Sequence, residues 1–185
     1  MTHLMLLALS GSLRKVSYNT AALRALQMLA PATVEIQLGN IGDLPLFNPD
    51  HEQLVEEGAV IPSLARLKEA LSHASGLIIA SPEYAHGISG PMKNALDWLV
   101  SGEEFPAKPI MLINTSPRAH HALDALKEVL RTMSGNVIDA AEVAIPLLGS
   151  GLDGQGIVGT PEIARALQRG LATFCEEIQK LHVQP

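Results

Sequence analysis

Three short, uninterrupted runs of apolar residues constrain the fold of this chain more than any other feature of its sequence. They span residues 4–9, 76–80 and 110–114, and the last ends on Asn114. A strand covered on one face alternates apolar and polar residues, whereas a strand covered on both faces is apolar throughout. The three runs therefore predict buried strands that carry helices on both faces of their sheet.

Amphipathic stretches lie between these runs and predict helices. Ser17 is a candidate N-cap and Pro31 a stop for the first helix, and Pro62 falls in the first turn of the second. A strand with one wetter face is expected at 33–38, a last strand within 137–145, and irregular chain at 39–61. The predicted helices span residues 17–30, 61–74, 91–99, 119–133 and 161–181.

Strands that alternate with helices in this way predict a parallel sheet. With 185 residues, the expected fold is α/β: a flavodoxin-like three-layer α/β/α sandwich whose five-stranded parallel sheet has the order 2-1-3-4-5. The Gly-rich stretch 148–159 precedes a single helix, so it is read as a surface loop. Residues 1–185 are accordingly expected to form a single domain.

Composition narrows the class of protein. A hydrophobic share of 47% and a charged share of 17% are typical of a globular chain. A net charge of −6 without a long basic run argues against nucleic-acid and anionic-membrane partners. No apolar run is long enough for a signal or a span, so a cytoplasmic protein is expected. The single cysteine, Cys175, is read as a buried small side chain.

In such a sheet, ligands bind beyond the carboxyl ends of the strands. The loop after the first run offers hydroxyl and amide groups together with one guanidinium, and a helix begins near its end. The donors and the positive end of the helix dipole favour a phosphomonoester; the alternative is an ordinary polar loop with an N-cap. Neither a dinucleotide fingerprint nor a P-loop is present. The polar residues are Ser10, Ser12, Arg14, Ser17 and Asn19.

The loop at 81–91 contains two prolines, two glycines, Tyr84 and His86. Tight turns would let its backbone approach a planar heterocycle closely; the alternative is a rigid turn that leads into a helix. The loop at 114–121 ends in the pair His120 and His121. Adjacent helical residues point about 100° apart and no acidic residue or cysteine completes a compact site, so the pair predicts a pocket edge rather than a metal centre.

Two of these loops resemble motifs of the NADPH-dependent FMN reductase family, the flavodoxin-like group that includes quinone, azo-dye and chromate reductases. The matching stretches are S-G-S-L-R-K-V-S-Y-N at 10–19 and P-E-Y at 82–84, followed by P-M-K-N-A-L-D-W at 91–98. The D-L-P at 43–45 and the L-D-G-Q-G at 152–156 are similar to further family segments. The resemblance thus covers most of the chain.

The resemblance implies that the first loop binds the FMN phosphate and that the second contacts the flavin ring, largely through its backbone. Lys93, Asn94, Asp97 and Trp98 match the motif but are expected to serve packing and interfaces. No catalytic side chain and no metal ligand is predicted. The predicted cofactor-binding residues are Ser10, Ser12, Leu13, Arg14, Ser17, Tyr18, Asn19, Pro82, Glu83, Tyr84, Ala85, His86, Gly87 and Ser116.

The sequence departs from the family pattern at two places. Ala85 stands where the family commonly has Asn. After Ser116, where the family is usually rich in glycine, this chain has the bulkier run P-R-A-H-H at 117–121. These two departures affect how the protein would bind the pyrimidine edge of the flavin and which nicotinamide cofactor it would prefer.

The expected function is an FMN-dependent NAD(P)H oxidoreductase that passes hydride from NAD(P)H through FMN to a quinone, a free flavin or a similar acceptor. Tyr84 and His86 are candidate substrate contacts. The resemblance also implies a homodimer or homotetramer, in which residues 39–61 and 101–105 would wall the partner's flavin site. Two alternatives stay open: a flavodoxin-like FMN electron carrier without NAD(P)H turnover, and a phosphate-ester-binding or hydrolytic protein without flavin.

Overall fold

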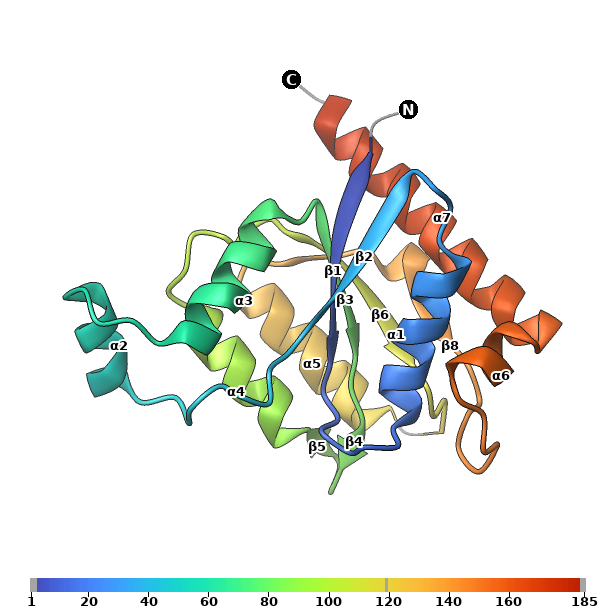
Figure 1. Cartoon of the computed structure of the whole chain (residues 1–185), viewed down its shortest axis with the longest axis horizontal. Coiled ribbons are helices and arrows are strands. Elements are labelled where there is room, and N and C mark those ends of the chain that lie inside the picture. The colour runs from blue at the N-terminus through green and yellow to red at the C-terminus, as the bar shows by residue number, and fades with distance from the viewer. Residues whose placement is uncertain (1–2, 119, 184–185) are drawn as a thin grey trace.

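Strands and helices alternate along the chain in the computed structural model, which describes residues 3–118 and 120–183 (Figure 1). The strands are β1 (Leu4–Ser10), β2 (Val34–Gly39), β3 (Gly76–Ala80), β4 (Glu83–Tyr84), β5 (Gly87–Ile88), β6 (Pro109–Asn114), β7 (Asn136–Val137) and β8 (Val143–Ala144). The helices are α1 (Tyr18–Leu29), α2 (Pro49–Glu56), α3 (Pro62–His73), α4 (Gly90–Leu99), α5 (His121–Thr132), α6 (Gly154–Val158) and α7 (Pro161–Val183).

The main sheet is parallel and runs in the order β2-β1-β3-β6, with β7 and β8 both paired to β6. Because β7 and β8 together occupy the fifth place, the order corresponds to the predicted 2-1-3-4-5. The predicted flavodoxin-like α/β/α sandwich is confirmed. The antiparallel pair β4–β5 lies outside this sheet.

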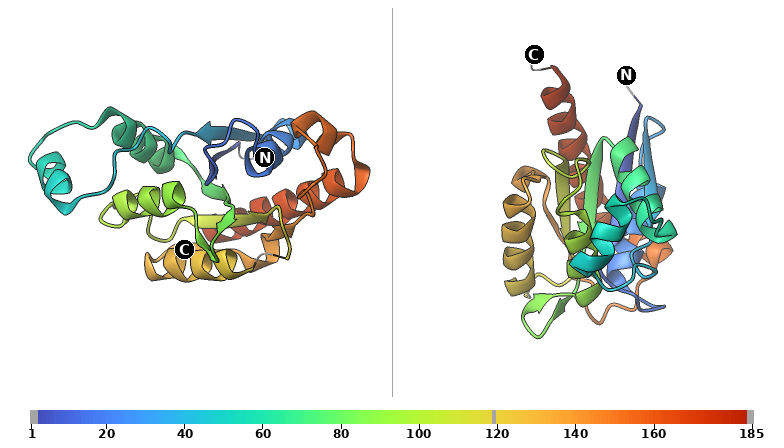
Figure 2. Two further views of the ribbon diagram at one scale, coloured as in Figure 1. Left: turned by 90° about the horizontal axis from the view of Figure 1, so that it is seen from below. Right: turned by 90° about the vertical axis from the view of Figure 1, so that its left-hand side faces the viewer.

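The two faces of β1 explain why the first apolar run does not alternate. Leu4, Leu6 and Ala8 belong to one core with residues of α1 and α7. Leu7 and Leu9 belong to a second core with residues of α3, α4 and α5. Both sets are almost fully buried, and α1 and α5 flank the sheet on opposite sides (Figure 2). A strand between two helical layers must be apolar on both of its faces.

The register of the strands aligns the starts of three loops. Ser10 at the end of β1 pairs with Ala80 at the end of β3, and Ala80 pairs with Ile113 near the end of β6. The loops that follow therefore leave the sheet side by side, at the edge near which the β4–β5 hairpin lies (Figure 1). This edge is the expected ligand edge of a doubly wound sheet.

The segment 39–61, which was expected to be irregular, contains α2. The Asn48 side chain caps this helix by accepting from the Asp50 backbone N–H at 2.9 Å, and Pro49 occupies its first position. The helix buries none of its residues and stands away from the sheet (Figures 1 and 2). Since it has no buried face, apolar periodicity did not mark it; its N-cap and proline were the available signals.

Three other boundaries differ from the prediction. A 3₁₀ turn at Asp139–Ala141 separates β7 from β8 within the expected last strand. The helix expected at 119–133 spans His121–Thr132, and Ala119 lies outside the described residues. The Gly-rich stretch 148–159, expected as a loop, contains α6, whose N-cap Asp153 accepts from the Gly156 N–H at 2.8 Å.

The structure also bears on the expectations for membrane spans and for the single cysteine. No helix in the described part of the chain is long and apolar enough to cross a membrane. Cys175 is half-buried against the α1–α7 core, and burial raises the pKa of its thiol to about 11. The thiol is therefore protonated at neutral pH and a poor nucleophile.

Candidate functional site

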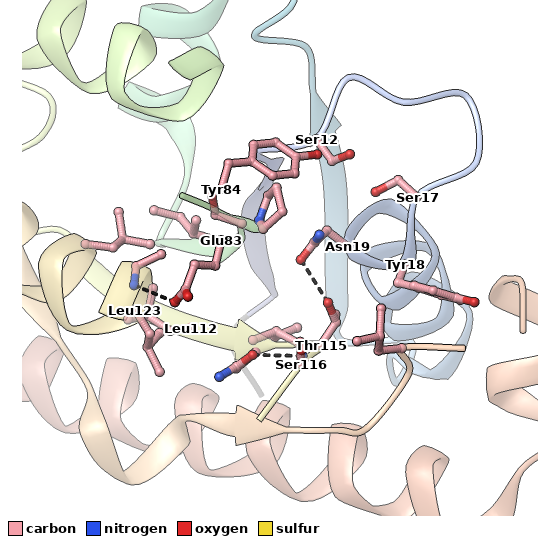
Figure 3. A pocket seen from close by; sticks show the side chains of 18 of the residues that line it. Ser12, Ser17, Tyr18, Asn19, Glu83, Tyr84, Leu112, Thr115, Ser116 and Leu123 are labelled. Atoms are coloured by element: carbon pink, nitrogen blue, oxygen red, sulfur yellow. Dashed lines mark hydrogen bonds between the residues drawn. The ribbon is translucent and has the colours of Figure 1, made fainter. Parts of the chain in front are cut away.

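A cavity of about 450 Å³ opens at the carboxyl edge of the sheet, where the loops after β1, β3 and β6 meet (Figure 3). This volume lies within the range of about 300–1,000 Å³ that is typical of small-molecule and cofactor sites. Its lining residues are Ser12, Arg14, Val16, Ser17, Tyr18, Asn19, Ile79, Ser81, Pro82, Glu83, Tyr84, Leu112, Ile113, Asn114, Thr115, Ser116, Ala122, Leu123, Leu126 and Leu148.

The loop after β1 is held by short-range hydrogen bonds between its own polar groups. The Ser10 and Thr20 hydroxyl oxygens lie 2.9 Å apart, and the Ser12 N–H donates to Ser10 Oγ at 3.3 Å. The Arg14 N–H donates to Ser12 Oγ at 3.4 Å. Ser10 therefore braces the loop and does not line the cavity, whereas Ser12 and Arg14 line it.

The start of α1 forms the next part of the wall. Ser17 is the N-cap, as predicted, and its Oγ accepts from the Thr20 N–H at 3.3 Å. The Tyr18 hydroxyl accepts from the Gly151 N–H at 3.0 Å, so it ties this wall to the loop after β8. The free N–H groups of the first turn give this end of α1 a positive character.

Asn19 is oriented by a residue that the sequence analysis did not select. Its Oδ1 accepts from the Thr115 hydroxyl at 3.2 Å, and both residues are more than nine-tenths buried. This bond joins α1 to the loop after β6 (Figure 3). Because the amide oxygen is used there, the donating amide nitrogen is the other polar end that Asn19 can present to a ligand.

Gly11 marks a close seam between the first two loops. Ser89, which is fully buried, donates through its hydroxyl to the Gly11 carbonyl oxygen at 2.7 Å. The Ser81 and Ser89 hydroxyl oxygens are 3.3 Å apart. A Cβ at Gly11 would lie 2.3 Å from Ser81 Oγ, so the only glycine of the loop is required for packing.

The P-E-Y motif leads into a hairpin. Glu83 pairs with Ile88 and Tyr84 with Gly87, with Ala85 and His86 as its two-residue turn. Both turn residues have positive φ, 48° and 59°. Such turns favour Asn-Gly, because a Cβ is strained in the left-handed region. Tyr84 lines the cavity, whereas Ala85, His86 and Gly87 do not.

The hairpin turn and the start of α5 bring three imidazoles into one stack. The rings of His86 and His121 are 4.4 Å apart between centroids, and those of His121 and His120 are 4.3 Å apart. The expectation of a 100° divergence took both residues as helical, whereas α5 begins at His121 and His120 is its N-cap. Neither ring is among the residues that line the cavity. Among the described residues, no group of three or more His, Cys, Asp or Glu side chains is placed to hold a metal ion.

An apolar wall completes the cavity. Ile79 lies in β3, Leu112 lies in β6, and Leu123 and Leu126 line the cavity from α5. The sequence analysis missed these residues because it sought ligand contacts in the loops and not in the strands and helix beneath them. A sequence signal for Ile79 and Leu112 did exist. Once a sheet order is assumed, the register of the strands places both residues near the carboxyl ends, beneath the loops.

The predicted cofactor-binding residues thus divide into two groups. Around the cavity, the loops after β1, β3 and β6 and the start of α1 bring together Ser12, Arg14, Ser17, Tyr18, Asn19, Pro82, Glu83, Tyr84 and Ser116. Those outside its lining are Ser10, Leu13, Ala85, His86 and Gly87. The Ser116 backbone is fixed by its N–H, which donates to Asn114 Oδ1 at 2.8 Å.

The model of one protein family, described as NADPH-dependent FMN reductase, matches residues 4–148. The chain belongs to this family. By homology its class is that of the NAD(P)H-dependent FMN and quinone reductases, so the predicted family and enzyme class are confirmed. The match includes all three loops that form the cavity.

Two relatives and one solved structure support this membership. The chain is 32% identical over 180 residues to an NAD(P)H-dependent FMN reductase from Pseudomonas aeruginosa, with 95% of each chain covered. It is 38% identical over 118 residues to a quinone reductase from Escherichia coli, which covers 61% of this chain and 60% of that protein. The structure of the flavoenzyme NAD(P)H:(acceptor) oxidoreductase FerB from Paracoccus denitrificans matches with a TM-score of 0.82 and 31% identity, over 96% of this chain and 98% of that one.

Proposed function

We propose that this family member binds FMN in the described cavity and passes hydride from NAD(P)H through it to a quinone, a free flavin or a similar small acceptor. The observation that carries the proposal is the polarity of the cavity. One end gathers a guanidinium, hydroxyls and a helix start, and the other is apolar and bounded by a hairpin. FMN has the same division between a phosphate and a flat ring.

The polar end suits a phosphomonoester. Arg14 supplies a charged fork, Ser12 and Ser17 supply hydroxyls, and the start of α1 adds its dipole. Asn19 has its amide oxygen occupied by Thr115, which leaves a donor rather than an acceptor for the anion. These four side chains come from one loop and one helix turn, so they form a unit that we call the phosphate cup.

The other end suits a planar ring. Ile79, Leu112, Leu123 and Leu126 exclude water there, and the hairpin brings Pro82 and the backbone of Glu83 and Tyr84 against the same space. Bound FMN supplies the hydride chemistry. The chain contributes binding, orientation and exclusion of water, and the proposal requires no acid or base from a side chain.

The proposal also includes assembly and location. Exposed apolar side chains occur on the segment around α2 and after α4: Leu46 is 83% exposed, Val60 74% and Val100 58%. Such side chains favour burial against another protein surface. This supports a homodimer or homotetramer in which residues 39–61 and 101–105 help to wall the partner's site. The proposal also takes each subunit as a single domain and the protein as cytoplasmic.

A spectrum of the freshly purified protein, followed by a turnover assay, tests the proposed function. We expect visible flavin absorbance, release of FMN on denaturation, and oxidation of NAD(P)H when FMN and a quinone are supplied. FMN binding without turnover would establish the electron-carrier alternative. Absence of any flavin binding would support the phosphate-ester alternative.

A further inference from the structure

Helix α5 begins without a capping side chain of its own. Its N-cap residue, His120, has φ −117° and ψ −20° and forms no side-chain hydrogen bond to the first turn. The first N–H groups of a helix have no partner within the helix, so they need one from elsewhere. In α5 the missing partner comes from a residue distant in sequence.

That partner is Glu83 in the P-E-Y hairpin. Its Oε2 accepts from the Ala122 backbone N–H at 2.9 Å, across 39 positions of sequence (Figure 3). A carboxylate at this end of a helix satisfies a free N–H and also interacts favourably with the helix dipole. The Glu83 carboxylate is therefore committed to α5, although the residue lines the cavity.

The tip of the same hairpin makes a second contact with α5. The His86 ring stacks on His121 with centroids 4.4 Å apart and planes tilted by 32°. Ala85 and His86 both have positive φ, a conformation that persists when surrounding contacts hold it. The base and the tip of the hairpin are thus both attached to the first turn of α5.

We propose that Glu83 is a positioning residue that sets the spacing of the planar-ring end of the cavity. The hairpin supplies one wall through Pro82 and Tyr84, and α5 supplies the facing apolar wall through Leu123 and Leu126. The hydrogen bond from the Ala122 N–H to the Glu83 carboxylate joins the two walls directly. This inference rests on the proposed function, because the ring in question is that of a flavin.

Two probes separate this role from that of the phosphate cup. FMN carries both the ring and the phosphate, whereas riboflavin has the same ring without the phosphate. Glu83→Ala should weaken the binding of both probes by the same factor, roughly tenfold. The reason is that the variant lacks the charge-assisted bond that holds the hairpin against α5, and the hairpin contacts the ring that both probes share. Titration of the apoprotein, followed by quenching of flavin fluorescence, measures both affinities.

Conservative variants test how Glu83 acts. Glu83→Gln keeps an acceptor oxygen at the same reach and should lose no more than about threefold for either probe. Glu83→Asp keeps the charge but is one methylene shorter, so it should lose about as much as Glu83→Ala. Hydrogen exchange of the Ala122 amide in the apoprotein should be faster in the Asp and Ala variants and near wild type in the Gln variant. Asp124→Asn is the matched control, because Asp124 is an exposed acid in the same helix turn.

Distinct results overturn the inference and the proposed function. If wild type binds FMN and Glu83→Asp binds FMN and riboflavin as tightly as wild type does, the positioning role is wrong. It is also wrong if Glu83→Ala weakens FMN but not riboflavin, or if Asp124→Asn loses as much as Glu83→Ala. Should Glu83→Ala not fold, the Asp and Gln variants decide the question. If wild type binds neither probe, the proposed function fails.

Discussion

The phosphate cup and the P-E-Y hairpin border the same cavity but are held in opposite ways. In the loop after β1, Ser10 bonds to Thr20 and Ser12, so partners lie within ten positions of sequence, and its non-glycine residues avoid positive φ. The hairpin has two residues at positive φ and is held by α5, through Glu83 and His86. The stretch from Ser12 to Ser17 is thus braced mainly by neighbouring residues, with long-range bonds at its two ends, from Ser89 to Gly11 and from Thr115 to Asn19. The turn of the hairpin is held by tertiary contacts with α5.

The largest expected effect is at the charged group of the cup. Arg14→Ala should lower the affinity for FMN by roughly 30- to 100-fold, about 2–3 kcal/mol, because it removes a charge-assisted contact to phosphate. Riboflavin affinity and the free energy of unfolding should change little, since Arg14 is exposed. Fluorescence titration measures the affinities, with Lys15→Ala, the neighbouring exposed cation, as control. An unchanged FMN affinity would remove Arg14 from the cup.

The seam between the two walls should be the next most sensitive position. Gly11→Ala places a Cβ 2.3 Å from Ser81 Oγ and 2.8 Å from Ser89 Oγ. We expect a loss of about 1–2 kcal/mol in the free energy of unfolding, because overpacking forces the neighbours apart. Urea denaturation measures it. The control is Gly90→Ala, where an added Cβ meets nothing within 4 Å. Equal effects of the two variants would contradict the claim that Gly11 is required for close packing between the loops after β1 and β3.

The strained turn of the hairpin predicts a gain in stability. Ala85→Asn should raise the free energy of unfolding by about 0.5–1 kcal/mol, because asparagine tolerates positive φ better than alanine does. Thermal and urea denaturation measure the change. Ala32→Asn, at an exposed alanine without positive φ, should give no such gain. If Ala85→Asn lowers the free energy of unfolding, backbone strain at the hairpin turn is not the feature by which the hairpin differs from the phosphate cup.

The smallest expected effect concerns the link between the cup and the loop after β8. Tyr18→Phe removes the hydroxyl that accepts from the Gly151 N–H. An exposed N–H can bond to water instead, so we expect a loss of about 0.5 kcal/mol in the free energy of unfolding. FMN affinity should stay within a few-fold of wild type. A larger change would show that the Tyr18–Gly151 bond positions the residues of the phosphate cup.

The contrast between the two walls also explains how far the sequence could predict the structure. The apolar runs indicated the sheet and its order, and Ser17 indicated the start of α1, because burial and capping are recorded in neighbouring residues. The cup followed from these elements. The helix α2 was missed because it has no buried face. The break between β7 and β8 was missed because the short turn at Asp139–Ala141 lies within the segment that was expected to contain the last strand.

The interior of the site was less predictable. The bonds from Thr115 to Asn19, from Ser89 to Gly11 and from Ala122 to Glu83 each join residues 39 to 96 positions apart. No local pattern records such pairs, since they depend on which loops the sheet brings together. For the same reason Glu83 was predicted as a ligand contact, whereas in the structure its carboxylate also caps α5.

The most direct test of the two-ended cavity is to compare the affinities of the wild-type apoprotein for FMN and for riboflavin under the same conditions. The cup and the hairpin act on different parts of the ligand, so FMN should bind at least about 30-fold more tightly, the difference being the contribution of the phosphate. Equal affinities for the two flavins would contradict the assignment of the loop after β1 as a phosphate cup.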